Sequence, residues 1–195
     1  PVLTLLICLP VTLLLFGPMG TWLGDGINLI CQFLMSTVGN WIVVALYAAL
    51  QPFLIMFGAA NFVMPVLMNF LTTQGYDPIF LVGSLISDAA VGGALLGYFL
   101  RSKNSQQKQL FGTTAFSAFM NITEPGIYGV FVKFRRPFFA VMIGGGLGGM
   151  FAGLMGVKGY SFAGLVSLTA WIGDGDYRNF YCAIIAVVIA IIGAG

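Results

Sequence analysis

Long apolar blocks alternate along this chain with short clusters of polar residues, glycine and proline. Two blocks, residues 79–100 and 137–157, each have about the 20 residues that a membrane-spanning helix requires. The chain begins inside a third apolar run, residues 1–16, and stops inside a fourth, residues 186–195. We therefore expect a partial membrane domain over residues 1–195, with a helix cut at each end.

Residues 22–36 are less uniformly apolar than the blocks around them. Asp25, Asn28 and Gln32 recur there every three or four residues, which places them on one stripe of a helix. This pattern predicts an amphipathic helix that lies in the membrane interface, with Trp22 as its anchor. A tightly packed helix of the bundle is the alternative.

Residues 41–71 are longer than one crossing requires, and Pro52, Gly58, Asn61 and Pro65 interrupt them. The pattern predicts either two short crossings that meet or one helix that is broken near mid-depth. Irregular backbone at membrane depth is tolerated only where it is buried in protein or lines a cavity. A plain turn is expected to follow at residues 72–78.

Composition identifies the chain as an integral membrane protein. Of its 195 residues, 59% are hydrophobic and only 7% are charged, whereas soluble domains carry about 25% charged residues. The net charge of +2 is too small to indicate a nucleic-acid partner. Histidine is absent, and Cys8, Cys31 and Cys182 stand in apolar runs, where they are expected to pack as small core residues. We therefore expect an all-α multi-helix bundle without a metal site or a cofactor.

Charge placement predicts a re-entrant hairpin over residues 109–132. Basic residues cluster in 101–108 and again in 133–136, and short loops rich in Lys and Arg stay in the cytoplasm. The segment between them is broken at Glu124-Pro125-Gly126, so that each arm is too short to cross. We expect the chain to enter from the cytoplasm, turn at a Thr123-Glu124-Pro125 tip and return. The segment 159–171 is also too short to cross, which indicates a second re-entrant element or a buried half-helix.

The hairpin tip carries most of the candidate site residues. A carboxylate such as Glu124 accepts short, strong hydrogen bonds from two hydroxyl groups at once, which suits the vicinal hydroxyls of a sugar. Asn121 and Thr123 add donors and acceptors at the same tip, and the ring of Tyr128 could pack against the C–H face of a sugar. The structural alternative is that Glu124 only stabilises the N-terminal end of the second half-helix.

Two further polar residues stand in other apolar elements. Asn61 lies in the break at residues 58–61, and Asp88 lies near the middle of block 79–100, beside Ser84 and Ser87. Each is a candidate for the path of a solute, or else a polar group satisfied by hydrogen bonds inside the bundle. A turn is expected at Asp174, Asp176 and Arg178.

Several stretches of the chain match one protein family in order. Residues 121–130, Asn-Ile-Thr-Glu-Pro-Gly-Ile-Tyr-Gly-Val, followed by Arg136-Pro137-Phe138, resemble a signature of the membrane IIC domains of bacterial sugar permeases. These permeases belong to the phosphoenolpyruvate-dependent phosphotransferase system (PTS). Residues 17–22, 58–65 and 87–103 agree with the same family. The chain resembles about the C-terminal half of such a domain, in the β-glucoside, sucrose and trehalose branch of the glucose superfamily.

The resemblance implies a dimeric, multi-pass carrier in the bacterial cell membrane. Its sugar lies in a membrane pocket and is contacted by the glutamate that corresponds to Glu124. The sugar is then phosphorylated at the cytoplasmic face by a phosphocysteine on the IIB domain, which receives its phosphate from IIA. The resemblance therefore makes this chain the transport part of a phosphotransferase complex, without a phospho-acceptor residue of its own.

The chain departs from the family pattern at two positions. Ala60 stands where the family carries a sugar-contacting histidine, and Asp88 stands where many relatives carry asparagine. A different sugar, altered coupling and a non-transporting paralogue are all open. Two acids at depth also allow an alternative class, an ion-coupled secondary transporter in which Glu124 or Asp88 carries a proton.

Overall fold

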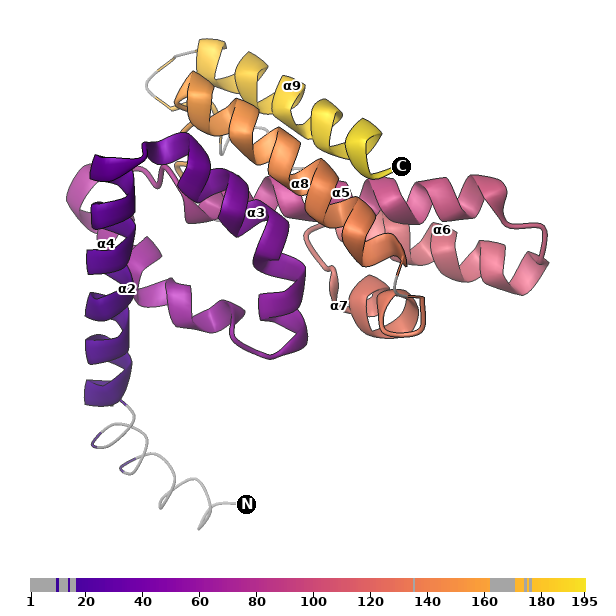
Figure 1. The fold of residues 1–195 in the computed structure, drawn as a ribbon, viewed down its shortest axis with the longest axis horizontal. Helices are drawn as coiled ribbons and strands as arrows, with labels where there is room; N and C mark the ends of the chain where they lie inside the picture. Colours follow the sequence, from indigo (N-terminus) through magenta and orange to yellow (C-terminus); the bar gives the residue numbers. More distant parts are fainter. Residues whose placement is uncertain are drawn as a thin grey trace.

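The computed structural model describes residues 10, 14, 17–134, 136–161, 171–173, 175 and 177–195. Over these ranges the chain is helical and contains no strand, which confirms the predicted all-α class (Figure 1). The elements are α2 (Gly17–Thr37), α3 (Asn40–Met56), the 3-10 helix η2 (Ala60–Val63), α4 (Met64–Gln74), α5 (Phe80–Arg101), α6 (Ser105–Phe119), α7 (Glu124–Gly126), the π-helix η3 (Ile127–Phe131), α8 (Arg136–Met155) and α9 (Tyr177–Ala194).

Some predictions fall on residues outside these ranges. They are the helix over residues 1–16, most of the element over 159–171, and the turn residues Asp174 and Asp176. The backbone of α2 is helical, as expected for residues 22–36. The side chains of Asp25 and Asn28 are not among those described, so the polar stripe of α2 and its interfacial position stay predictions.

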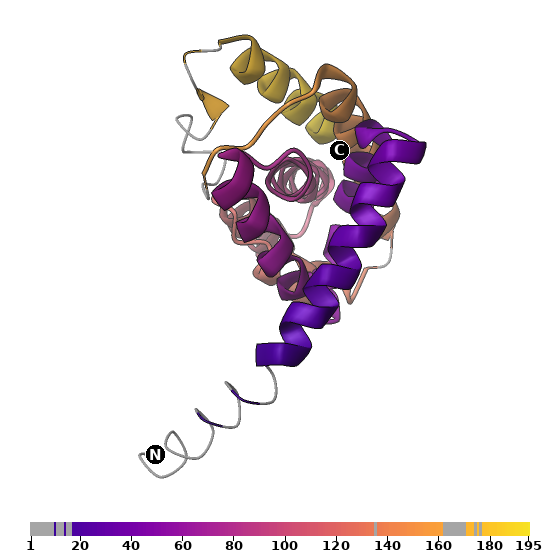
Figure 2. The same ribbon diagram turned by 90° about the vertical axis from the view of Figure 1, so that its left-hand side faces the viewer.

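Helix α5 is the central element of the bundle. It packs against α3, α6, α8 and α9, and in Figure 2 it runs nearly end-on through the middle of the molecule. Every residue from Phe80 to Leu95 except Ser84 is buried, as expected for a helix that is surrounded on all sides. Its 22 residues span about 33 Å at 1.5 Å per residue, enough to cross the hydrocarbon core.

Within the part of the chain that the structure describes, three helices are long and apolar enough to cross a membrane: α5, α8 and α9. The first two match the predicted blocks 79–100 and 137–157. Helix α3 is also apolar but shorter, with 17 residues. The chain is thus a membrane protein built around α5.

Glycines on α8 let its neighbours approach to backbone contact. A Cβ atom added at Gly149 would lie 2.9 Å from the Cα of Ala45 in α3, and one added at Gly148 would lie 2.8 Å from the carbonyl oxygen of Ala186 in α9. Such small residues are typical of helix interfaces in membranes. Gly145 and Gly153 face α3 in the same way, and Gly144 faces α9. Helix α8 is therefore clamped between α3 and α9.

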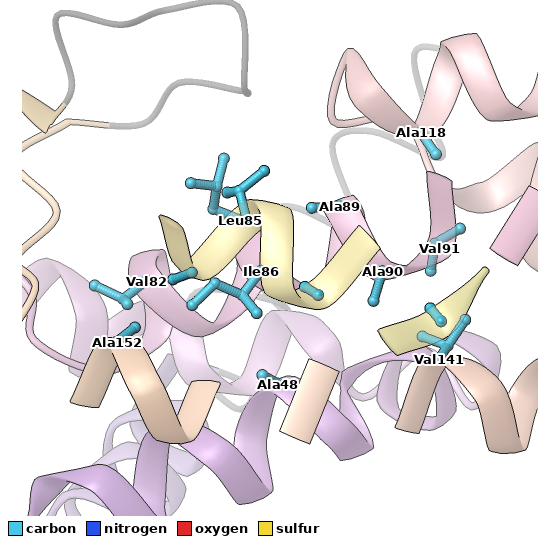
Figure 3. Close-up of a cluster of buried hydrophobic side chains, with 14 of the residues drawn as sticks. Ala48, Val82, Leu85, Ile86, Ala89, Ala90, Val91, Ala118, Val141 and Ala152 are labelled. Atoms are coloured by element: carbon cyan, nitrogen blue, oxygen red, sulfur yellow. The ribbon is translucent and has the colours of Figure 1, made fainter. Parts of the chain in front are cut away.

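Small side chains fill the remaining space around α5. Figure 3 shows Ala48 of α3 and Ala152 and Val141 of α8 gathered with Ile86 and Ala90 of α5. All five are almost fully buried. Because these side chains are short, the helices can pack closely without voids.

The break predicted within residues 41–71 lies at residues 57–59, between α3 and η2. Of the interruptions expected at Pro52 and Pro65, the one at Pro52 is wrong, whereas Pro65 does stand where a new helix begins. Pro65 occupies the first turn of α4, where no donor is needed, and Pro52 remains inside α3. Pro52 cannot donate to the carbonyl of Ala48, and Gly145 of α8 packs against that same carbonyl oxygen.

The two predicted polar loops are shorter than expected. Helix α4 continues through Gln74 and ends where Gly75 adopts φ 75°, so the first part of the turn at 72–78 is helical. Helix α6 begins at Ser105, and the Asn104 side chain accepts a 3.0 Å hydrogen bond from the backbone N–H of Gln106. Only residues 102–104 of the predicted loop are therefore non-helical, because Asn104 is an effective N-cap.

Asp77 anchors the start of α5. Its Oδ1 accepts hydrogen bonds from the backbone N–H groups of Ile79 at 2.6 Å and Phe80 at 2.7 Å. Its backbone also pairs in both directions with Gly159, at 2.8 and 2.9 Å. The residue is fully buried, and this burial raises the pKa of its carboxyl group to about 6. The segment predicted as a plain turn therefore holds the start of α5 in place and pairs it with Gly159.

Asp77→Ala is expected to lower the free energy of unfolding by about 1–2 kcal/mol, because two helix N–H groups lose their acceptor. Asp77→Asn keeps the acceptor oxygen and should lose less. Thermal unfolding of the detergent-solubilised full-length protein measures both changes. Equal stability of wild type and Asp77→Ala would contradict this role.

Asp77 should also make stability depend on pH. Its pKa of about 6 in the folded protein lies above the ordinary 3.8, so the folded state binds the proton more tightly. The contribution of this group to stability is therefore full below pH 3.8 and falls as the pH rises to 6. Unfolding measured across this pH range should show stability falling as the pH rises in the wild type. The same fall should be absent in Asp77→Asn. An unchanged pH profile in the variant would refute it.

Gly149→Ala is expected to destabilise the bundle by about 1–3 kcal/mol, because its Cβ would meet the backbone of α3. Gly146→Ala is the matched control on the same helix, since its Cβ would lie 3.7 Å from Ala49, an ordinary contact. The control should be neutral or more stable by up to about 1 kcal/mol, the helix preference of Ala over Gly. Thermal unfolding compares them, and an equal effect of the two changes would argue against the clamp.

Candidate functional site

A cavity of about 230 Å³ lies where the break after α3, the middle of α5 and the turn before α7 meet. Apolar side chains such as Ile55, Leu67 and Leu85 form part of its wall. The polar residues that line it are Tyr47, Gln51, Asn61, Ser84, Asp88, Asn121, Thr123 and Glu124. A hollow that combines apolar walls with convergent polar groups is typical of a small-molecule site, and this one is richer in polar groups than most.

Five of the six residues predicted from the sequence line this cavity. Glu124, Thr123 and Asn121 come from the turn before α7, Asn61 comes from η2, and Asp88 comes from α5. These elements are far apart in the sequence, so the fold is what brings them together. Their role in binding a sugar stays a prediction.

The turn that carries Glu124 is tightly folded. Asn121 has φ 68°, a left-handed conformation that asparagine tolerates better than most residues. The backbone N–H of Ile122 donates to the carbonyl of Ser117 at 3.0 Å, and that of Asn121 donates to Ala118 at 3.0 Å. These bonds end α6 and reverse the chain directly before Glu124.

The Glu124 carboxylate is available to a ligand. Glu124 is the first residue of the three-residue helix α7, and its side chain is exposed. Within the described ranges it makes no hydrogen bond to backbone N–H groups or to side chains. No capping hydrogen bond from Glu124 within the described ranges therefore supports the alternative, in which Glu124 only stabilises the start of the half-helix.

Asp88 contrasts with Glu124 in its surroundings. Only 5% of the Asp88 residue surface is exposed, yet the residue lines the cavity. In the part of the chain that the structure describes, its carboxylate has no hydrogen-bond partner. The two carboxylates are near enough to repel each other.

Three lining residues were missed as site candidates: Tyr47, Gln51 and Ser84. The Gln51 side chain donates from Nε2 to Ser84 Oγ at 2.7 Å, and the Tyr47 hydroxyl is also hydrogen-bonded to Ser84. Tyr47 and Gln51 are four residues apart and therefore share one face of α3, as Ser84 and Asp88 do on α5. That spacing of polar groups in apolar helices was the available signal.

Tyr128 lies outside the cavity. Its hydroxyl donates to the carbonyl oxygen of Ile55 at 2.9 Å, with a longer contact of 3.4 Å to that of Met56. These carbonyls lie at the end of α3, and that of Ile55 also accepts from the backbone N–H of Gly58 at 2.9 Å. Tyr128 thus fastens η3 to the end of α3 and positions two walls of the cavity relative to each other.

The cavity offers little to a metal ion. Across the described residues no group of three or more His, Cys, Asp or Glu side chains is gathered. Two carboxylates alone provide fewer ligands than protein sites for hard cations use. Its polar groups instead suit a ligand with many hydroxyl or amino groups.

Comparison with known proteins points to one family. The family described as "Phosphotransferase system, EIIC" matches residues 1–145. The beta-glucoside-specific EIIBCA component of the PTS from Bacillus subtilis (strain 168) is 36% identical over 176 residues, which cover 89% of this chain and 28% of the relative. The trehalose-specific EIIBC component from Escherichia coli (strain K12) is 30% identical over 195 residues, covering 98% of this chain and 41% of the relative.

A third relative agrees with these two. The arbutin-, cellobiose-, and salicin-specific EIIBC component from Escherichia coli (strain K12) is 32% identical over 164 residues, covering 84% of this chain and 34% of the relative. The chain thus spans between a quarter and a half of the length of these relatives. No solved structure matches it. The matched residues include the turn with Glu124, and the chain belongs to the phosphotransferase system EIIC family.

Proposed function

We propose that this chain is the sugar-binding and translocating part of a PTS permease, which carries a glucoside or disaccharide inward for phosphorylation. One observation carries the proposal: the Glu124 carboxylate opens into a cavity and has no hydrogen bond within the described chain. The family supports it, as do relatives named as specific for beta-glucoside, trehalose and sucrose.

The chemistry of the cavity suits a sugar. Glu124 accepts from two neighbouring hydroxyl groups in charge-assisted hydrogen bonds. The amides of Asn61 and Asn121 each donate and accept, so they can read further hydroxyl groups. Apolar side chains such as Ile55 and Leu67 line the same cavity and would face the C–H groups of the ring.

The position of the breaks supports translocation. In transporters, interrupted helices near mid-depth form substrate sites, and their freed backbone groups face the substrate. Here the break at residues 57–59 and the turn at 120–123 both adjoin the cavity. Residues 109–132 act, in this proposal, as a re-entrant hairpin whose tip delivers the sugar toward the cytoplasm.

The soluble partners are part of the proposal. The relatives are named as EIIBC and EIIBCA components, which supports IIB and IIA domains as the phosphate donors for the sugar bound here. The phosphocysteine belongs to IIB, and this chain presents the sugar to it. The carrier works as a homodimer that passes several times through the bacterial plasma membrane.

Glu124→Gln is expected to weaken β-glucoside binding by about 10- to 100-fold, the loss of one or two charge-assisted hydrogen bonds. Equilibrium dialysis with the full-length protein in detergent measures it. Asp77→Asn is the matched control, because it also converts an acid to an amide but lies outside the cavity. Wild-type affinity in Glu124→Gln would overturn the site assignment.

Membrane vesicles distinguish group translocation from ion-coupled transport. With phosphoenolpyruvate and the soluble phosphotransfer proteins inside, the full-length protein should release sugar phosphate. Accumulation of unmodified sugar that follows a pH gradient, without phosphoenolpyruvate, would instead favour the ion-coupled class.

A further inference from the structure

Two carboxylates from different helices line one cavity. Asp88 enters from α5 and Glu124 from α7, and they are near enough to repel each other. Among the lining residues that the structure describes there is no lysine, arginine or histidine. The negative charge of the cavity is therefore not balanced by the side chains that line it.

The groups around Asp88 do not satisfy it. Asp88 is 95% buried, since only 5% of its surface is exposed, and it has no hydrogen-bond partner among the residues described. The nearby amide of Gln51 is already directed to Ser84 at 2.7 Å.

Gln51 adds an unpaired acceptor to this side of the site. The residue is 94% buried, with 6% of its surface exposed, and its Oε1 has no hydrogen-bond partner. Gln51 lines the cavity too, so two acceptors on this side, Asp88 and Gln51 Oε1, have no donor among the described residues. What is missing there is a hydrogen-bond donor, and a buried unpaired carboxylate is costly without one.

A proton or a cationic ligand could remove this imbalance. A proton shared between Asp88 and Glu124 would occupy one of the two Glu124 oxygens and supply a single donor. A protonated primary amine supplies three N–H donors and one positive charge, so it can bridge both carboxylates. At pH 7 such an amine is largely protonated, since α-amino groups have pKa values of about 7.7–8.0.

We propose that the substrate is an amino sugar, whose ammonium group lies between Asp88 and Glu124. The inference rests on the proposed function, sugar binding in this cavity, and makes it narrower. Glu124 then binds both the ammonium and a neighbouring hydroxyl group, whereas Asp88 acts as the specificity determinant for the charge.

The test compares ligands that differ only in charge. Phenyl β-glucoside is measured against four analogues in which one hydroxyl, at C2, C3, C4 or C6, is replaced by an amino group, and against their N-acetyl derivatives. Binding is measured at pH 7 by equilibrium dialysis with the full-length protein in detergent. At least one amino analogue should bind about 10-fold more tightly than the parent, the lower end for a charge-assisted hydrogen bond, and its N-acetyl derivative should lose that advantage.

The variants assign the preference to Asp88. In Asp88→Asn the ratio of the two affinities, amino analogue over parent, should fall about 10-fold toward one. Asp77→Asn, an acid-to-amide change outside the cavity, should keep the wild-type ratio. The comparison of ligands on wild type stands even where Asp88→Asn does not fold.

The outcomes separate this inference from the function beneath it. Wild type that binds phenyl β-glucoside but favours no amino analogue overturns the inference and leaves the proposed function in place. Wild type that binds none of the ligands overturns both. A preference that persists in Asp88→Asn overturns the assignment to Asp88.

Discussion

The structure depends on one constraint: backbone polar groups at membrane depth must find partners inside the protein. The helices are interrupted at residues 57–59 and 120–123. In both places backbone N–H groups donate hydrogen bonds to carbonyl groups of the helix that has just ended. Ala59 N–H donates to Leu54 at 2.7 Å, and Ile122 N–H donates to Ser117 at 3.0 Å. Tyr128 adds a side-chain donor to the carbonyls of Ile55 and Met56. Because the breaks are satisfied, they can persist beside a cavity.

The same constraint explains why the rest of the bundle is so regular. Helix α5 runs unbroken through the centre, and the glycines of α8 hold α3 and α9 at backbone contact. The glycine contacts hold α3 at Trp41, Ala45 and Ala48, and Phe53 stacks on Phe138 of α8 closer to the break. Asp77 fixes the start of α5 in turn, so that Asp88, three helical turns on, faces the broken elements.

The sequence was sufficient for features that depend on local pattern. The blocks that became α5 and α8 were visible as apolar runs, and Glu124-Pro125-Gly126 marked the turn because a charge and two helix breakers coincide there. Features that depend on partners distant in the sequence were not visible. Pro52 was expected to break α3, but the carbonyl that it leaves unbonded packs against a glycine of α8.

Tyr128 and Gln51 illustrate the same limit within the site. An aromatic hydroxyl next to a sugar-binding motif suggests a ligand contact, yet the carbonyl groups that Tyr128 satisfies are 73 and 72 residues away. Gln51 stands in an apolar run beside a proline, and only the fold shows that it meets Ser84 of α5. The composition shows that polar residues are few in this chain, but it does not show which of them contact one another.

The site and the fold share one origin. Breaking the chain before α7 places Glu124 at the cavity that Asp88 of α5 also lines. Asp88 is buried away from water, whereas Glu124 is exposed. In water such a pair would cost little. In this cavity the buried Asp88 carboxylate has no donor among the described residues, so the group that is hardest to accommodate in the bundle is also the one on which the proposed discrimination between ligands depends.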